Sequence, residues 1–368
     1  MIVVGLGFIY LAITRGREPY VLLPIGIGII LTNLPETALT TFEPGSSESG
    51  IFGIVQYYGI EFWDILPPLI FLGLGAMTDF GPVIANPKTL LLGGAAQVGI
   101  FVAFWGALAT DRFNVGEAAS IGIIGGADGP TTIFLSAILA PEILGVTAVV
   151  AYTYMASVVF IQPPLMKLLT TVKERGIVMR PQRDVSRNEK LFFPTVAMVL
   201  IILVVPQSAP LISMFMMGNL FRESGVVPRL ADAASNELLN IATIFLMVTV
   251  GTQLTSERVF DVDTVVIFGL GLAAFSCGTI GGLLFAKLMN LFLREKLNPL
   301  IGSAGVSAVP MAARISHQIG QEANPGNYLL SHAMGPNVAG VIGSAVVAGV
   351  FITLAPVAGE AAFGTWFS

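Results

Sequence analysis

Long apolar segments recur from one end of the chain to the other, and they constrain its fold more than any other feature. Only 11% of the 368 residues are charged and 54% are hydrophobic, whereas about 25% of residues are charged in a soluble domain. Segments of spanning or nearly spanning length lie at about 1–13, 20–35, 61–79, 89–110, 118–139, 143–166, 191–206, 236–254, 263–291, 298–318 and 327–355. The sequence therefore predicts an all-α polytopic membrane protein with about 11 transmembrane segments.

Charge, cysteine and histidine content exclude several classes of function. The formal net charge is −5, and the basic residues cluster in loops without forming a nucleic-acid-binding face. Cys277 is the only cysteine, which excludes an intrachain disulfide and a cysteine-based metal cluster. No third ligand is spaced to join His317 and His332 in a metal site, so both are expected at membrane interfaces. Residues 1–13 lack a basic leader and are expected to form a short first membrane helix rather than a signal peptide.

One strongly charged segment, residues 167–190, divides the chain near its middle and is called the basic loop below. Its lysines and arginines place it in the cytoplasm by the positive-inside rule. Residues 36–50 are expected to form a polar loop, and residues 209–225 an interfacial or re-entrant piece. The predicted organisation is an N-terminal membrane segment (1–19), a first transmembrane repeat (20–166), the basic loop, a second transmembrane repeat (191–355) and a C-terminal tail (356–368).

The two halves of the chain resemble each other in sequence. Leu23-Pro24 corresponds to Phe193-Pro194, and Ile124-Gly125-Gly126-Ala127 corresponds to Ile301-Gly302-Ser303-Ala304, at an offset that rises slowly along the chain. Each predicted half holds five spans, an odd number, so the second copy would enter the membrane from the opposite face. An inverted 5+5 repeat with two broken helices is typical of ion-coupled transporters. This topology would place Arg15 and Arg17 outside, against the positive-inside rule.

The first predicted helix break lies within the apolar stretch 121–134. Three glycines and Pro130 fall within six residues there, which disrupts a helix, and Asp128 is the one ionisable side chain nearby. A carboxylate in hydrocarbon costs at least about 2.5–3.5 kcal/mol, so intramembrane acids usually pair or bind ions. Asp128 could instead serve only as the N-cap of a second half-helix. Because a neutral residue would cap without the charge penalty, an ion site is the preferred interpretation.

The second predicted break, residues 298–314, repeats this design without an acid. Asn298 and Ser307 supply neutral oxygens, although close helix packing is an equal alternative for the serines and glycines here. Arg314 follows Ser307 by two helical turns and is predicted on the same face, nearer the membrane surface. A snorkelling anchor is the alternative role for Arg314. Asn337 is another neutral oxygen at membrane depth.

Four long motifs give this chain a specific resemblance to a known family. They resemble motifs of the β subunits of sodium-pumping, biotin-dependent decarboxylases, the membrane subunits of the oxaloacetate, methylmalonyl-CoA and glutaconyl-CoA decarboxylases. The motifs lie at residues 73–82, 125–131, 298–314 and 332–340. The similarity extends from about Glu18 to Phe351. The N-terminus and the 36–60 loop are shorter than in the oxaloacetate enzymes, which leaves open the complex to which this chain belongs.

The resemblance implies a reaction, partners and a location. A carboxyltransferase (α) subunit would transfer CO₂ from an acyl substrate to biotin on a carrier domain. This chain would then decarboxylate carboxybiotin, consuming a proton, and export Na⁺ with the free energy released. Na⁺ and non-covalently presented carboxybiotin are therefore the implied cofactors. The other implied features are a biotin carrier, a small γ or δ membrane subunit, a homotrimer and a multi-pass location in the cytoplasmic (inner) membrane.

The resemblance also implies the residues of the site. Positions that match essential residues of the family are Asp128, Tyr154, Asn298, Gly302, Ser307 and Arg314. Asp128 would be the charged ligand of Na⁺, with neutral oxygens from Asn298, Ser307 and Asn337, the donors that a hard cation prefers. Gly302 would belong to the same sodium site. Arg314 would hold the carboxybiotin carboxylate, and Tyr154 would relay a proton unless it is a packing aromatic.

Two other functions fit much of the same pattern. A secondary Na⁺-coupled transporter or a Na⁺/H⁺ antiporter without decarboxylation would use the same broken helices, repeat and acid. Only the motif resemblance and Arg314 speak against it. A passive channel is disfavoured, because an inverted repeat indicates alternating access. A biotinylated protein that co-purifies from the native membrane would identify the decarboxylase.

Overall fold

The computed structural model describes residues 1–16, 18–35, 38–43 and 49–364, with the backbone alone from 356 to 364. Arg17 and part of the predicted 36–50 loop lie outside the described residues. Within these ranges the chain forms helices and no strand. The fold is therefore all-α, as the sequence predicts.

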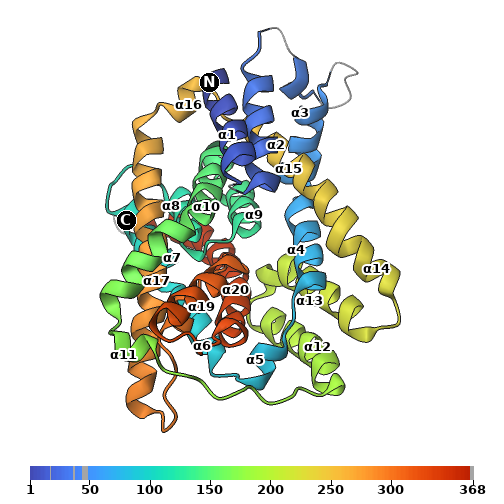
Figure 1. Cartoon of the computed structure of the whole chain (residues 1–368). Coiled ribbons are helices and arrows are strands. Elements are labelled where there is room, and N and C mark those ends of the chain that lie inside the picture. The colour runs from blue at the N-terminus through green and yellow to red at the C-terminus, as the bar shows by residue number, and fades with distance from the viewer. Residues whose placement is uncertain (17, 36–37, 44–48, 365–368) are drawn as a thin grey trace.

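Among the described residues, ten α-helices begin before the basic loop and ten begin within or after it (Figure 1). The first ten are α1 Ile2–Arg15, α2 Pro19–Thr32, α3 Ile51–Gln56, α4 Leu66–Met77, α5 Gly81–Ala85, α6 Thr89–Ala96, α7 Val98–Leu108, α8 Val115–Gly122, α9 Gly129–Leu139 and α10 Leu144–Leu169. The others are α11 Val172–Arg175, α12 Arg187–Val204, α13 Ala209–Ser224, α14 Pro228–Ala233, α15 Leu239–Thr252, α16 Ser256–Val259, α17 Val262–Phe292, α18 Leu300–Ser303, α19 Met311–Ala323 and α20 Leu330–Gly364.

In the part of the chain that the structure describes, five helical stretches are long and apolar enough to cross a membrane, and a sixth is added if a bent pair counts as one span. The five are Thr89–Leu108, Pro141–Leu169, Pro228–Thr252, Val262–Phe292 and Leu330–Ala355. The bent pair joins Ile51–Phe62 to Leu66–Met77 at 75°. Several other predicted segments form apolar helices of 10–17 residues. The chain is a polytopic membrane protein, and the number of about 11 spans stays a prediction.

Reciprocal hydrogen bonds at the polar ends of two helices define where these helices begin. Asn114 accepts from the Glu117 N–H at 2.9 Å, and the Glu117 carboxylate accepts from the Asn114 N–H at 2.7 Å. Ser186 and Glu189 form the same capping box at the start of α12. Each box satisfies two backbone donors that the first helical turn leaves free. These caps set the start of the helix that leads into the first break and of the helix that follows the basic loop.

Corresponding long helices of the two halves run in opposite directions (Figure 1). α7 leads to a turn in which Arg112 pairs with Asp263 at 2.5 Å, near the start of α17. α17 ends on the other side, where Lys287 pairs with Glu174 of the basic loop at 3.1 Å. α10 likewise leads into the basic loop, whereas the first turn of α20 lies beside it, where the Gln182 amide contacts the Ser331 carbonyl oxygen at 3.4 Å. An inverted repeat requires this antiparallel relation, while the exact boundaries of the repeats stay a prediction.

Most of residues 209–225, expected to form an interfacial or re-entrant piece, belong to the regular helix α13, which ends at Ser224. α13 packs against α4 and α12 and buries Leu211, Ile212, Phe215, Met216, Gly218 and Asn219. A Cβ atom on Gly218 would lie 2.0 Å from the Leu72 carbonyl oxygen, so α13 and α4 contact each other backbone to backbone. The second half thus holds one long helix more than the five predicted. The helix order of the two halves matches when α1 is compared with α12 and α2 with α13.

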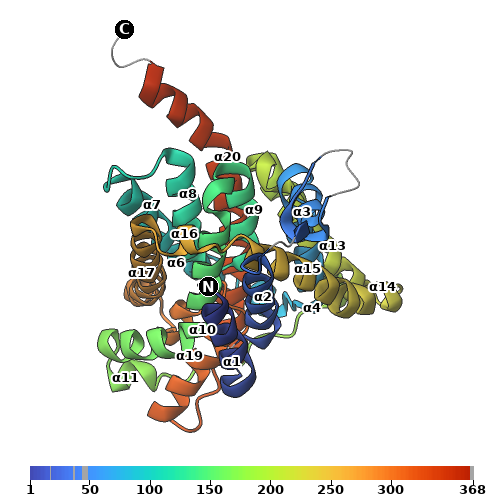
Figure 2. The ribbon, with the colours of Figure 1, turned by 90° about the horizontal axis from the view of Figure 1, so that it is seen from above.

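The helices around the first break occupy the centre of the molecule. Residues 118–136 are all buried, which includes the end of α8, the 3₁₀ segment Ile123–Gly126 and most of α9. α9 packs against α8, α10 and α20, and Figure 2 shows these central helices with α11, α14 and α17 further out. A break placed here is shielded from lipid, and unwound backbone is tolerated at membrane depth only under this condition.

Candidate functional site

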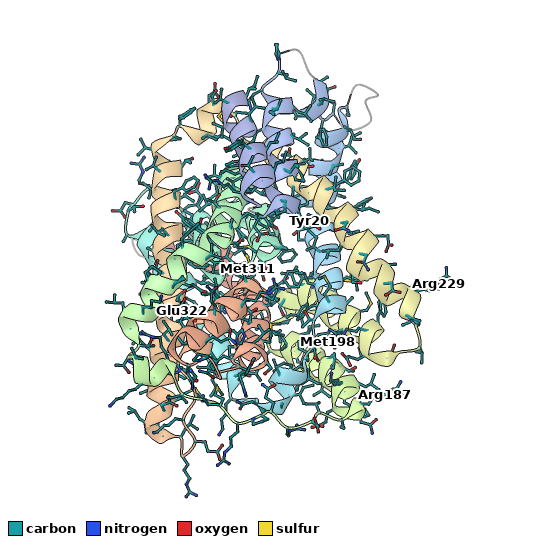
Figure 3. All side chains as sticks on the ribbon, in the orientation of Figure 1. Tyr20, Arg187, Met198, Arg229, Met311 and Glu322 are labelled. Atoms are coloured by element: carbon teal, nitrogen blue, oxygen red, sulfur yellow. The ribbon has the colours of Figure 1, made fainter. Side chains whose placement is uncertain are left out.

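The two helix breaks are in direct contact at the centre of the molecule. In the first break, the 3₁₀ segment ends at Gly126, Ala127 has a left-handed backbone (φ 55), and α9 begins at Gly129. In the second break, seven residues separate the end of α18 from Met311, which opens α19 and lies near mid-height in Figure 3. The Ser307 N–H donates to the Gly126 carbonyl at 2.9 Å and joins the two unwound segments. The two breaks therefore meet, an arrangement typical of transporters built from inverted repeats.

Asp128 lies within this junction and is only 4% exposed. Its Oδ1 accepts a hydrogen bond from the Thr131 N–H at 3.2 Å, so Asp128 does cap α9, as the alternative interpretation proposed. Its Oδ2 accepts from the Ser344 hydroxyl at 2.7 Å. Within the described part of the chain, no lysine or arginine forms an ion pair with this carboxylate. A buried carboxylate without a cationic partner favours a bound cation.

Two serine hydroxyls extend the polar group around Asp128. The Ser344 and Ser307 oxygens lie 3.4 Å apart, and both side chains are buried. Asp128, Ser307 and Ser344 come from the first break, the second break and α20, respectively. Sequence reasoning missed Ser344, because it lies in a long apolar run. Its spacing of two helical turns from Asn337 is the signal that could have identified it.

Two buried amide side chains, those of Asn337 and Gln97, donate to backbone carbonyls near the breaks. The Asn337 amide donates to the Ala304 carbonyl at 2.9 Å and to the Val306 carbonyl at 2.8 Å. Gln97, which the sequence did not indicate, donates to the Gly93 carbonyl at 2.9 Å. Considering described residues only, the amide oxygens of Asn337 and Gln97 are buried without a hydrogen-bond partner. A Cβ atom on Gly126 would lie 3.7 Å from the Gln97 amide oxygen, so Gln97 lies beside the first break. Unpartnered amide oxygens are suitable donors for a hard cation.

A cavity of about 460 Å³ opens beside the carboxylate. Its lining includes Asp128, Ser307, Tyr152 and a second acid, Glu18. Tyr152 packs against the start of α9, since a Cβ atom on Gly129 would lie 2.5 Å from its hydroxyl oxygen. Sequence reasoning missed both residues, because Glu18 reads as part of a short turn and Tyr152 as one aromatic in an apolar helix. Glu18, which directly precedes α2, thus reaches the central cavity.

Tyr154 points away from this cavity. Its hydroxyl donates to the Phe268 carbonyl of α17 at 2.5 Å, and its ring packs against Gly271. The bond connects α10 to α17 and occupies the phenolic proton. The structure therefore supports the packing alternative for Tyr154, and Tyr152 is the tyrosine that lines the Asp128 cavity.

Arg314 lies in the first turn of α19 and its side chain is exposed. Across the described ranges, its guanidinium takes part in no ion pair. The prediction that Arg314 shares a helix face with Ser307 is wrong, because α19 begins only at Met311 and Ser307 precedes it in irregular backbone. α19 then leads to Glu322, which pairs with Lys167 of the basic loop at 2.7 Å. Arg314 therefore lies on the basic-loop side of the break.

The structure does not bring Asn298 into the group around Asp128. The Asn298 amide donates to the carbonyls of Arg175 and Ile177, at 2.8 and 2.9 Å, and its oxygen accepts from the Leu300 N–H. Asn327 donates to the same two carbonyls, at 3.0 and 3.1 Å. The expected ligand role of Asn298 is therefore corrected to a structural one, since its amide ties the second break to the basic loop.

Gly302 lies where α18 crosses α17. A Cβ atom on Gly302 would lie 2.1 Å from the Gly282 carbonyl oxygen, and a Cβ atom on Gly282 would lie 2.0 Å from the Gly302 carbonyl oxygen. Only glycines allow the two backbones to approach this closely. The contact positions the segment that carries Ser307, which makes Gly302 part of the site through backbone packing.

Known proteins share this sequence over nearly its whole length. The model of the family "Na⁺-transporting oxaloacetate decarboxylase beta subunit" matches residues 1–355. The methylmalonyl-CoA decarboxylase subunit beta of Propionigenium modestum is 56% identical over an alignment of 370 positions. This alignment covers 96% of this chain and 94% of that protein. The glutaconyl-CoA decarboxylase subunit beta of Acidaminococcus fermentans is 54% identical, with 96% and 92% covered. The oxaloacetate decarboxylase beta chain of Klebsiella pneumoniae is 49% identical, with 96% and 94% covered. This chain therefore belongs to the family of beta subunits of Na⁺-transporting decarboxylases.

Proposed function

We propose that this chain decarboxylates carboxybiotin and couples the reaction to Na⁺ export. One observation carries the proposal: the unpaired carboxylate of Asp128 is buried where two helix breaks meet, beside a cavity of about 460 Å³. Broken helices that meet at a buried acid are the usual ion site of transporters built from inverted repeats. The names of the relatives supply the reaction class.

The proposed sodium site combines one charge with several neutral oxygens. Asp128 provides the charge, and Ser307 and Ser344 provide hydroxyl oxygens within the same hydrogen-bonded group. The amide oxygens of Asn337 and Gln97 are buried and free to complete the shell. Because the oxygens come from both halves of the chain, a movement of one half against the other opens the shell. This division supplies the coupling between ion release and conformational change.

The chemical step breaks one bond and needs one proton. The N–CO₂⁻ bond of carboxybiotin is cleaved, CO₂ leaves, and the ring nitrogen takes up a proton to give biotin. Arg314 is proposed to hold the carboxylate, because its exposed guanidinium lies on the basic-loop side of the break and can form a forked hydrogen bond. Tyr154 keeps its proposed role as a proton relay only if its bond to Phe268 is released.

We also propose which subunits assemble with this chain and on which side of the membrane they bind. A carboxyltransferase (α) subunit and a biotin carrier would supply carboxybiotin on the basic-loop side, in the cytoplasm. A small γ or δ membrane subunit would complete an assembly in the cytoplasmic membrane, with this chain as a trimer. The basic loop with its seven lysines and arginines fits the cytoplasmic side by the positive-inside rule.

Proteoliposomes that contain only this purified chain provide the test. Free carboxybiotin is added outside, and CO₂ release and ²²Na⁺ uptake are measured together. We expect CO₂ release that depends on Na⁺ and an uptake of ²²Na⁺ that stops when carboxybiotin is exhausted. Sodium flux driven by an ion gradient, without any CO₂ release, would instead identify a secondary transporter or antiporter.

A further inference from the structure

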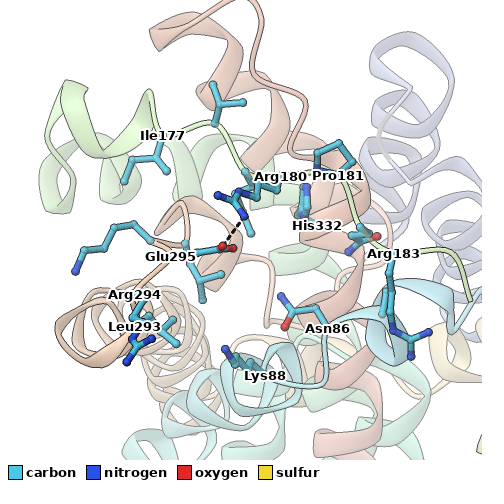
Figure 4. Close-up of a pocket in the computed structure, with 16 residues that line it drawn as sticks. Asn86, Lys88, Ile177, Arg180, Pro181, Arg183, Leu293, Arg294, Glu295 and His332 are labelled. Atoms are coloured by element: carbon cyan, nitrogen blue, oxygen red, sulfur yellow. Dashed lines mark ion pairs between the residues drawn. The ribbon is translucent and has the colours of Figure 1, made fainter.

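A second cavity, of about 560 Å³, lies on the basic-loop side of the molecule (Figure 4). It is formed by the α5–α6 turn, residues 177–183 of the basic loop, residues 293–297 after α17 and the first turn of α20. It shares no lining residue with the Asp128 cavity. Its volume falls within the range of about 300–1,000 Å³ that is typical of small-ligand pockets.

The cavity is strongly cationic. Its lining carries the five basic residues Lys88, Arg180, Arg183, Arg294 and Lys296, and the one acid Glu295. Arg180 pairs with Glu295 at 2.7 Å, and Arg183 pairs with Glu189 at 2.6 Å. Taking the described residues alone, Lys88, Arg294 and Lys296 form no ion pair. Three unpaired cations around one cavity raise the local concentration of anions.

A buried histidine completes the polar part of this lining. His332, which was expected at a membrane interface, is only 5% exposed and lies at the cavity (Figure 4). Its Nδ1 is buried and has no hydrogen-bond partner among the residues that the structure describes. A buried, unpartnered ring nitrogen at a cavity wall is typical of a position that a ligand satisfies. His332 also lies in the first turn of α20, where the helix dipole favours a negative charge.

The cavity adjoins the second helix break through three short connections. Leu297 lines the cavity, and the next residue is Asn298, which holds the break to the basic loop. Ile177, whose carbonyl accepts from Asn298, also lines the cavity. His332 precedes Asn337 by five residues of one helix, an axial rise of about 7.5 Å. The cavity wall is thus continuous in sequence with the second break, the segment that carries Ser307.

We propose that this cavity is the entry site for the carboxylated ureido ring of biotin. The inference rests on the proposed function, since it names the place where the substrate of that reaction first binds. The unpaired cations receive the carboxylate, and Nδ1 of His332 bonds a polar atom of the ring. The apolar part of the lining, from Ile177, Met179 and Leu293, contacts the ring and its methylene arm. Arg314 then receives the carboxylate closer to the break.

Steady-state kinetics with free carboxybiotin test this site. The variant removes the three unpaired cations, as Lys88→Gln, Arg294→Gln and Lys296→Gln together. The control removes three exposed cations that line neither cavity, as Lys173→Gln, Arg229→Gln and Arg258→Gln. We expect KM for carboxybiotin to rise about tenfold in the cavity variant, the lower end of the range for electrostatic focusing. We expect kcat and the thermal stabilisation by Na⁺ to stay unchanged, and the control to behave as the wild type.

The dependence of KM on salt, and a comparison of free with carrier-bound carboxybiotin, distinguish substrate binding in this cavity from docking of the carrier protein. The KM of the wild type rises with ionic strength, because salt screens exposed charges, and the KM of the cavity variant rises much less. An unchanged KM in the cavity variant would overturn the inference while leaving the proposed function intact. A higher KM for carrier-bound carboxybiotin alone would also overturn it, since the cations would then dock the carrier protein. If the wild type released no CO₂ at all, the proposed function itself would fail.

Discussion

Replacing Asp128 with asparagine separates the sodium role of this residue from its capping role. Asparagine caps helices about as well as aspartate, so the bond to the Thr131 N–H is kept. The amide also retains one oxygen near Ser344. The change therefore removes the negative charge with little change in shape. Because no ion pair of the described residues compensates this charge, the sodium-free protein should be at least as stable after the substitution.

The expected loss of sodium affinity follows from the burial of the site. Two opposite charges about 4 Å apart attract each other by about 4 kcal/mol at an effective dielectric constant of 20. Asp128 is 4% exposed, so water screens this attraction little. A loss of about two-thirds of this energy raises the dissociation constant for Na⁺ about 100-fold, since each 1.4 kcal/mol is a factor of ten.

Thermal unfolding in detergent, with Na⁺ titrated against choline, measures this loss. A ligand that binds only the folded state stabilises it by about 2.7 kcal/mol at 100 times its dissociation constant. The wild type should therefore gain Tm with Na⁺, and Asp128→Asn should gain almost none over the same range. Asp79→Asn is the matched control, because Asp79 pairs with Lys190 at 3.0 Å outside the cavity. Equal stabilisation of Asp128→Asn and the wild type by Na⁺ would refute the ion-ligand role.

Three further substitutions test the roles of Arg314, Gly302 and Glu189. Arg314→Lys should lower kcat/KM for free carboxybiotin about tenfold and leave Na⁺ stabilisation unchanged, because lysine lacks the planar fork; equal kinetics would leave Arg314 as an anchor. Gly302→Ala should cost about 1–3 kcal/mol by overpacking, measured by thermal unfolding, whereas Gly94→Ala, with no atom within 4 Å of its added Cβ, should be neutral or stabilising. The hydrogen bond from Arg183 lowers the pKa of Glu189 to about 2 from 4.5. The stability that Glu189 contributes is therefore complete above about pH 4.5 and lost as the pH falls through about 2. In acid unfolding, the Glu189→Gln variant should therefore lack the part of the loss of stability that occurs between about pH 4.5 and 2. A stability profile identical to that of the wild type would contradict this prediction.

Local composition was sufficient to predict the helix breaks and the acid between them. Glycine and proline disrupt the hydrogen bonds of a helix wherever it lies. The breaks at 125–130 and 302–310, and Asp128 at the first of them, could therefore be identified from neighbouring residues alone. The sequence likewise predicted an inverted second half, although the structure pairs α2 with α13 and not, as the match of Leu23-Pro24 with Phe193-Pro194 implied, with α12. Apolar length also predicted the helices, although it missed that residues 209–224 form one.

The partners of Asp128 were decided by the tertiary structure. Ser344 lies 216 positions after Asp128, in an apolar helix that shows no sign of a polar contact. Glu18 and Tyr152 reach the cavity only because the start of α2 and the first half of α10 both line it. Asn298 had the right chemistry for a ligand, yet the fold directs its amide to the basic loop. Backbone breaks are encoded locally, whereas the oxygens that converge on a buried charge depend on which distant helices pack together, and no local pattern specifies that.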